Sequence, residues 1–183
     1  MSRVYLDHNA TMPLRAEARA AMIAAMDVAG NPSSVHAEGR AAKALIEKAR
    51  AQVARAFGAE GADVVFTSGA TEAAALALAG RGLQGAAVEH DAVFRAAPDA
   101  EVVPVDDGAV DGDALGKLLA GSGRALVAIQ QVNSETGAIQ LVDDFTATAH
   151  ETGDWLVADC SQSAAKEYLP DCDMAVVSAH KLG

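Results

Sequence analysis

The sequence predicts an α/β fold in which a mostly parallel sheet is flanked by helices. Short apolar runs of strand length alternate along the chain with segments whose apolar residues recur at helical spacing. Such alternation favours right-handed crossovers between parallel strands, with helices on both faces of the sheet. Hydrophobic residues make up 51% of the 183 residues and aromatic residues only 4%, an alanine-rich composition that suits helices packed closely on a sheet.

The first third of the chain is predicted to be mostly helical. Residues 4–6 form a short strand at most, and the polar run 7–13 has the Asx and proline content of a structured loop. Residues 14–28 place apolar side chains on one helical face, and Gly30 ends that helix. A serine of the pair at 33 and 34 is expected to cap the next helix, from about 35 to 57. The expected core stripe of that helix is Ala42, Leu45, Ile46, Ala49, Val53 and Phe57.

The rest of the chain is predicted to alternate strands with helices. The predicted strands are residues 63–67, 86–88, 101–105, 125–129, 155–158 and 174–177. The predicted helices are residues 70–80, 92–96, 113–119 and 144–152. The sequence contains no internal repeat, linker or low-complexity segment, so we expect one domain over residues 1–183.

Charge and composition exclude several classes of partner. A net charge of −11 and a pI near 4.7 argue against binding to nucleic acid or to an anionic membrane. The amino terminus lacks an apolar signal core, and no run of about 18 apolar residues is present, so we expect a cytoplasmic protein. Cys160 and Cys172 are too few and too isolated for a disulfide framework or a zinc site, and we expect reduced thiols.

Polar residues follow the predicted strands, where ligands gather in open α/β sheets. Ala70 and Thr71 begin a helix directly after a strand, so free backbone N–H groups and a hydroxyl can face an anion there. Asp159 follows an apolar strand and needs a partner that is cationic or donates a hydrogen bond. The full set of strand-end residues is Thr71, His90, Asn133 with Ser134, Asp159 with Gln162, and Ser178 with His180 and Lys181.

This set has the chemistry that pyridoxal 5′-phosphate (PLP) requires. The cofactor needs an amine for its aldehyde, a carboxylate for its ring nitrogen, donors for its phenolic oxygen, a flat group over its ring and a phosphate site. Lys181 can supply the amine, because lysine forms Schiff bases with carbonyl compounds. Taken singly, each residue also has an ordinary interpretation, such as a solvated lysine, a capped helix or a surface histidine.

Seven stretches, in family order from end to end, make the sequence resemble the cysteine desulfurases, PLP enzymes of the class V aminotransferase group. These stretches are Tyr5-Leu6-Asp7-His8-Asn9-Ala10-Thr11, Gly30-Asn31-Pro32-Ser33-Ser34-Val35-His36, Thr67-Ser68-Gly69-Ala70-Thr71-Glu72, Glu89-His90, Glu135-Thr136-Gly137, Asp159-Cys160-Ser161-Gln162 and Ser178-Ala179-His180-Lys181.

The resemblance implies the large domain of a PLP-dependent transferase of fold type I, incomplete in this chain. It implies that Lys181 bonds to the cofactor, that Asp159 pairs with the pyridine nitrogen and that Gln162 contacts the phenolic oxygen. It further implies that His90 stacks on the ring and handles protons together with Lys181. The other implied cofactor contacts are Thr71, Ser178 and His180 at the phosphate, and Ala70, Asn133 and Ser134.

The reaction implied by the resemblance converts L-cysteine into alanine, while a separate enzyme cysteine takes the sulfur as a persulfide. A homodimer in the complete enzyme, a sulfur-acceptor protein and a role in iron–sulfur cluster assembly are also implied. Ser134 stands where the family usually has asparagine. The family continues beyond Gly183 for roughly as many residues again, with the sulfur-accepting cysteine and the arginine for the substrate carboxylate. We therefore expect this chain to be an amino-terminal portion that is inactive alone.

Two other interpretations remain open at this point. The chain is compatible with another class V enzyme, a selenocysteine lyase or an aminotransferase, because the cofactor apparatus is shared. It is also compatible with a non-catalytic module that assembles with a complementary chain.

Overall fold

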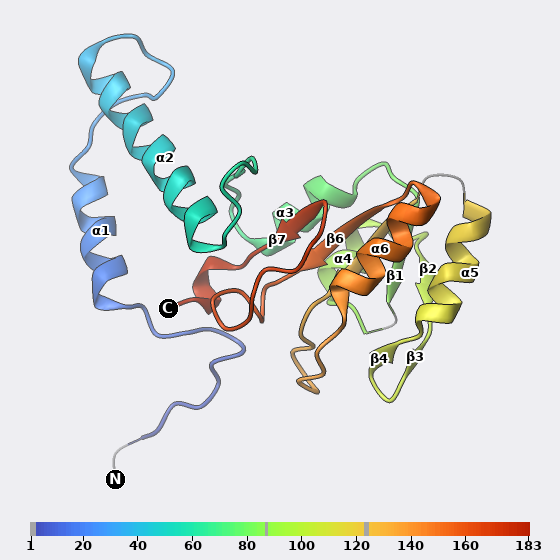
Figure 1. The fold of residues 1–183 in the computed structure, drawn as a ribbon. Coiled ribbons are helices and arrows are strands. Elements are labelled where there is room, and N and C mark those ends of the chain that lie inside the picture. The colour runs from blue at the N-terminus through green and yellow to red at the C-terminus, as the bar shows by residue number, and fades with distance from the viewer. Residues whose placement is uncertain (1–2, 87, 123–124) are drawn as a thin grey trace. The chain divides into compact units, whose positions relative to one another are not determined.

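The structure is a computed structural model that describes residues 3–86, 88–122 and 125–183. The chain divides into two compact units, which Figure 1 allows the reader to follow by colour. One unit contains the residues up to Phe66 together with His180–Gly183, and the other contains Thr67–Ala179. Each unit is described by itself.

The larger unit is built around a five-stranded sheet whose strands all run parallel, in the order β2-β1-β5-β6-β7 (Figure 1). The central strand β5 buries all five of its residues, as expected for a strand covered on both faces. The predicted α/β class with a mostly parallel sheet is confirmed. The strands are β1 (Leu83–Ala86), β2 (Glu101–Val103), β5 (Leu126–Gln130), β6 (Trp155–Asp159) and β7 (Met174–Val176).

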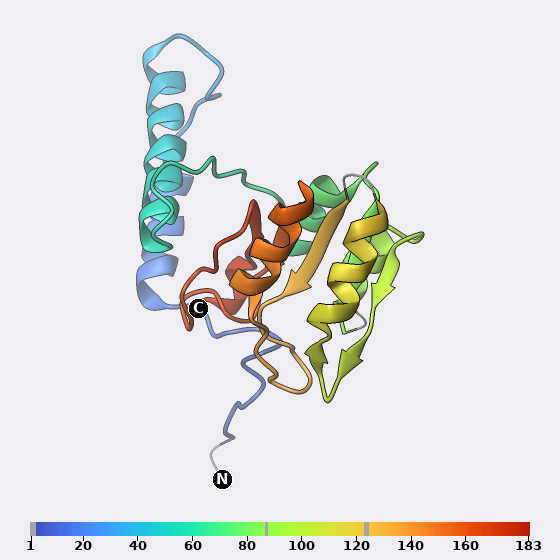
Figure 2. The same cartoon turned by 45° about the vertical axis from the view of Figure 1, so that its right-hand side comes forward.

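Helices cover both faces of this sheet. Figure 2 shows α5 (Gly112–Ser122) and α6 (Val142–Thr152) in front of the sheet, with α3 (Ala70–Leu78) and α4 (Asp91–Ala96) behind it. Successive strand side chains point to opposite faces, so each strand contributes to both cores. The core on the α3 and α4 side joins Ala74, Leu78 and Val93 to Leu126, Ala128, Val157 and Val176.

The smaller unit contains α1 (Ala16–Met26) and α2 (Ala37–Ala56), close to the predicted helices. The predicted serine cap of α2 is wrong. Ser33 and Ser34 both donate backbone N–H bonds to Asn31 in a turn, and His36 caps the helix through Nδ1, which accepts the N–H of Gly39 at 3.3 Å. Position 39 requires glycine, because a Cβ there would collide with carbonyl oxygens of this turn.

The predicted core stripe on α2 is only partly buried. Ala42 is buried, but Leu45 is 40% exposed and Ile46, Ala49, Val53 and Phe57 are half-buried. The neighbouring helix α1 buries none of its residues. The helical spacing therefore predicted the more buried face of α2. Most residues of that face remain partly exposed in the described unit.

One predicted strand is absent from the described residues. The run 63–67 has strand composition but pairs with no other described segment, and Val65 and Phe66 are 72% and 50% exposed. Residues 4–6 are likewise irregular and exposed. Strand formation requires a neighbour that completes the backbone hydrogen bonds, so composition alone was not sufficient.

Two other strands differ from their predicted bounds. The predicted strand at 86–88 begins earlier, at Leu83; Val88 lies in a turn, and residue 87 lies outside the described residues. The predicted strand at 101–105 divides at Pro104, which lacks a backbone N–H. Beyond it, β3 (Val105–Asp106) pairs with β4 (Ala109–Val110) around Asp107 and Gly108, whose φ angles are 46° and 81°. An Asp-Gly dipeptide at such a turn is a hairpin signal that our prediction missed.

The other predicted helices and strands of the larger unit are present, with ends shifted by a few residues at most. In the part of the chain that the structure describes, no helix combines the length and the apolar character needed to cross a bilayer.

We expect Leu78→Ala to destabilise the larger unit by about 2–5 kcal/mol, because Leu78 is 1% exposed and its removal leaves a cavity under the sheet. The matched control is Leu76→Ala in the same helix, where Leu76 is 62% exposed and the expected change is within about 0.5 kcal/mol. Urea unfolding followed by the fluorescence of Trp155, the chain's single tryptophan, measures both. Equal losses in the two variants would contradict this packing.

Candidate functional site

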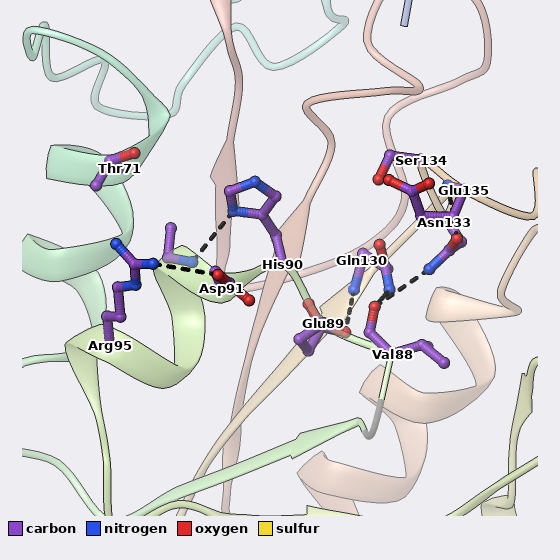
Figure 3. A pocket seen from close by; sticks show the side chains of 11 residues that line it. Thr71, Val88, Glu89, His90, Asp91, Arg95, Gln130, Asn133, Ser134 and Glu135 are labelled. Carbon is purple, nitrogen blue, oxygen red and sulfur yellow. Dashed lines mark hydrogen bonds and ion pairs between the residues drawn. The ribbon is translucent and has the colours of Figure 1, made fainter. Parts of the chain in front are cut away.

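A pocket of about 410 Å³ lies beyond the carboxyl ends of β1 and β5 (Figure 3). This volume is within the range of about 300–1,000 Å³ that is usual for small-molecule sites. The start of α3, the turn before α4, α4 itself and the segment after β5 surround it. Four of the predicted site residues line it together: Thr71, His90, Asn133 and Ser134.

The turn that carries His90 is fixed to the end of β5. The backbone N–H of Gln130 donates to Glu89 Oε1 at 2.8 Å, and the side-chain amide of Gln130 donates to the carbonyl oxygen of Val88. Asn133 Nδ2 donates to the same carbonyl at 3.2 Å. These bonds, drawn in Figure 3, hold the backbone on which the His90 ring stands.

The orientation of His90 is set by the helix that it precedes. Its Nδ1 accepts the backbone N–H of Ala92 at 3.1 Å and so caps α4. A backbone N–H can only donate, so this bond assigns the neutral ring the tautomer that carries its proton on Nε2. In Figure 3 the ring projects into the space between Thr71 on one side and Ser134 on the other.

Asn133 supports the pocket from within the loop after β5. Its Oδ1 accepts the backbone N–H groups of Glu135 and Thr136, at 2.8 and 2.9 Å, as well as the hydroxyl of Thr136 at 3.2 Å. Only 8% of Asn133 is exposed. Its amide therefore shapes the loop that carries Ser134, which is half-buried at the pocket.

The start of α3 reaches the pocket at Thr71. Gly69 is the N-cap and supplies no side-chain cap, so the first backbone N–H groups of the helix, including those of Ala70 and Thr71, have no partner within it. Glu72 Oε2 accepts the backbone N–H of Ser68 at 2.6 Å, and this hydrogen bond lowers the pKa of Glu72. The helix dipole adds a partial positive charge at the same end.

Asp159 is the last residue of the next strand, β6, and Gln162 lies in the turn after it. Asp159 pairs in register with Gln130 at the ends of β6 and β5, and its Oδ1 accepts the backbone N–H of Ser161 at 2.9 Å. Asp159 borders a second, small apolar hollow with Leu78 and Val93, and is not among the lining residues of the larger pocket. Gln162 is half-buried in the turn that follows β6.

Ser178 is the last predicted site residue of the larger unit, 3% exposed just after β7. His180 and Lys181 belong to the smaller unit, in the 3₁₀ turn η1 (Ala179–Lys181). There the carbonyl of His180 accepts the backbone N–H of Met12 at 2.9 Å, and its Nδ1 lies 3.1 Å from the hydroxyl oxygen of Thr11. The amino-terminal loop thus fixes the backbone next to Lys181.

Glu89 is a site residue to which our sequence analysis gave no role. It is 8% exposed and lines the pocket beside His90. Burial raises its pKa well above the ordinary value; the charge of Asp159 adds to this, and the hydrogen bond from Gln130 opposes it. Gln130 was also missed. An acidic residue directly after a strand and a glutamine ending the most apolar strand were the available signals.

Within the described ranges, no three His, Cys, Asp or Glu side chains gather as metal ligands would. The two cysteines are separate from the pocket: Cys160 is fully buried and Cys172 half-buried.

The family model described as aminotransferase class V matches residues 4–183. The chain belongs to this family. It is 37% identical to a cysteine desulfurase of Frankia sp. (strain EuIK1) over 98% of its own length and 50% of the relative's. It is 35% identical to the cysteine desulfurase IscS of Dictyoglomus turgidum, over 97% of this chain and 50% of that one. The chain spans about half the length of the curated relatives it matches.

Solved structures agree with this family. A NifS-like protein from Rickettsia africae superposes with a TM-score of 0.92 at 33% identity, over 98% of this chain and 55% of that one. The structure titled SspA in complex with cysteine superposes with a TM-score of 0.88 at 26% identity, over 97% and 57%. The resemblance to cysteine desulfurases and the predicted fold are confirmed.

We expect neither cysteine to react readily with iodoacetamide in the folded chain. Burial is the main cause that raises the pKa of Cys160 to about 12, and Cys172 and Asp159 contribute less. Burial, together with the charges of Asp171 and Asp173, raises the pKa of Cys172 to about 11. Thiolate is the reactive form, so at about pH 7.5 modification should be at least about a hundredfold slower than for an ordinary cysteine with a pKa of about 8.5, and faster as the pH rises. Mass spectrometry of native and urea-unfolded chain measures both rates. Equal rates would contradict the burial of these thiols.

Proposed function

We propose that the protein carrying this chain is a PLP-dependent cysteine desulfurase, to which the chain contributes the amino-terminal portion. The reaction would convert L-cysteine into alanine and a sulfur atom held as an enzyme persulfide. Curated cysteine desulfurases that are 31–37% identical to the chain support the proposal, as does its similarity to the structure titled SspA in complex with cysteine. The observation that carries it is the pocket that joins an open helix start, the fixed ring of His90 and the loop of Ser134 at one edge of the sheet.

The start of α3 fits the cofactor's phosphate. Ala70 and Thr71 offer first-turn N–H groups, and Thr71 adds an exposed hydroxyl on the rim of the pocket. We assign the phosphate to this helix start and propose that Ser178 and His180 complete its contacts.

The polar strand ends fit the cofactor ring. When bound, PLP supplies an electron sink for the negative charge that develops at the substrate's α-carbon. Asp159 is proposed to keep a proton on the pyridine nitrogen, since a carboxylate beside it favours the charged form. Gln162 is proposed to contact the phenolic oxygen of the ring, and Ser134 is proposed as a further polar contact of the cofactor. Asn133 holds the loop of Ser134 in place.

His90 is proposed to stack on the cofactor ring. Its capping bond to Ala92 fixes the ring plane and engages Nδ1, so the proton that His90 presents is the one on Nε2. Protonating Nδ1 would break the cap of α4. With Nδ1 held in the cap and a proton already on Nε2, the neutral ring can donate a hydrogen bond through Nε2, and it can accept a proton only at Nδ1, with loss of the cap.

Lys181 is proposed to bond to the cofactor aldehyde and then to move protons at the substrate's α-carbon. The other lysines lack its setting at a strand end: Lys43 and Lys48 lie on α2, Lys117 lies on α5, and Lys166 donates to the carbonyl of Gln162 at 2.8 Å. L-cysteine as substrate, a homodimer and a sulfur-acceptor protein form part of the same proposal.

We expect borohydride reduction in the presence of PLP to attach a pyridoxyl group to Lys181, because reduction makes the lysine–cofactor bond permanent. Peptide mapping of the protein that carries this chain locates the label. Lys181→Arg should abolish both the label and the release of sulfide and alanine from cysteine, whereas the control Lys166→Arg should keep both.

A label on another lysine would contradict the assignment of Lys181. A label on Lys181 without activity on cysteine would support the PLP assignment but contradict the proposed cysteine desulfurase activity. In that case, activity on selenocysteine would indicate a selenocysteine lyase, and activity on an amino donor with an oxo acid would indicate an aminotransferase.

A further inference from the structure

We propose that Glu89 is a positioning residue of this site and that, as a neutral carboxylic acid, it ties the turn carrying His90 to the end of β5. The inference rests on the proposed function for what the pocket binds. The contacts that support it all lie within the larger unit.

The side chain of Glu89 extends from the turn before α4 to the end of the central strand β5. Its Oε1 accepts the backbone N–H of Gln130 at 2.8 Å, across 41 positions of sequence. Its side chain passes close to Gly85, where an added Cβ would lie 3.9 Å from Glu89 Cγ. Its Oε2 is buried and has no hydrogen-bond partner among the described residues. One oxygen thus anchors the turn and the other is left in the interior.

The surroundings of Glu89 disfavour a charge on it. Asp159, at the end of the strand β6 that pairs with β5, acts on Glu89 as a like charge. The other charged groups among the described pocket residues are exposed. Arg95, the one lysine or arginine among them, forms an ion pair with Asp91 at 3.3 Å, and Glu135 adds a negative charge. A buried carboxylate without a cationic partner is costly, so the group keeps its proton. Burial and Asp159 accordingly raise the pKa of Glu89, against the weaker effect of the Gln130 N–H.

A neutral Glu89 has two consequences for the site. The anchor at Oε1 remains, and Glu89 adds no negative charge to the site. The His90 turn is thereby held without a second charge that would repel an anionic ligand group. Glutamine has the same shape and no charge, so Glu89→Gln should preserve the anchor, whereas Glu89→Ala should remove it.

Thermal unfolding of this chain without any cofactor tests the protonation. Unfolded Glu89 ionises near 4.5, while the folded form keeps its proton to higher pH. The folded state then binds more protons, so the wild type loses stability as the pH rises above about 4.5 toward the folded pKa. Glutamine does not titrate. The melting temperature of Glu89→Gln minus that of the wild type should therefore increase as the pH rises above about 4.5 and level off only above the folded pKa of Glu89.

The matched control is Glu101→Gln, because Glu101 is an exposed glutamate of the same sheet. The rise with pH for Glu89→Gln is measured against this control. A flat or falling difference for Glu89→Gln would show that Glu89 is ionised in the folded chain and would overturn the proposal.

Binding of PLP to the protein that carries this chain tests the positioning role. Affinity and the circular dichroism of the bound cofactor, which reports how its ring is held, should change by less than about twofold in Glu89→Gln. Glu89→Ala should weaken binding by about tenfold or more and reduce the dichroism.

Each outcome of the binding experiment has a distinct meaning. Equal losses in the glutamine and alanine variants would show that the negative charge is needed and would overturn the neutral form. An unchanged alanine variant would remove the positioning role. If the wild type does not bind PLP, the proposed function fails, while the unfolding experiment still decides the state of Glu89.

Discussion

Gln130, the last residue of the central strand, connects the separate parts of the site. Its backbone N–H holds Glu89 and its side-chain amide holds the carbonyl of Val88, so the turn before α4 cannot move independently of the sheet. On its other side Gln130 pairs in register with Asp159. The position of His90 and the spacing to Asp159 therefore depend on the register between the strands. A shift of the strand register by one residue would turn each side chain of the strand to the opposite face and separate these residues.

The all-parallel sheet explains why polar groups accumulate at this edge. Parallel strands end on the same side, and a helix that follows such a strand begins there, with unpaired N–H groups and the positive end of its dipole. Beneath the edge, the apolar core between α3, α4 and the strands fixes the backbone. The chain places side chains that suit an anionic, aromatic ligand where these features coincide: Thr71, His90, Asn133 and Ser134.

Periodicity was sufficient to predict most of the fold, because the helices and strands of the larger unit are covered by their neighbours. It failed at residues 63–67, where a strand-like composition has no described partner, and at residues 101–105, where Pro104 and the turn at Asp107 divide the run. Strand-end placement predicted that His90 faces a ligand, and His90 lines the pocket; Thr71 lines it as well, although the strand predicted before it is absent from the described residues. The roles of Glu89 and Gln130 were out of reach, because they depend on a contact across 41 positions that only the sheet register creates.

The proposed function requires PLP to bind at the carboxyl ends of the strands. Amide NMR shifts recorded while PLP is added to the protein that carries this chain test it most directly. We expect the largest changes at Thr71, His90 and Ser134, and little change at Trp155, which begins β6 at the opposite edge. Largest changes around Trp155, or equal changes at both edges, would contradict the claim.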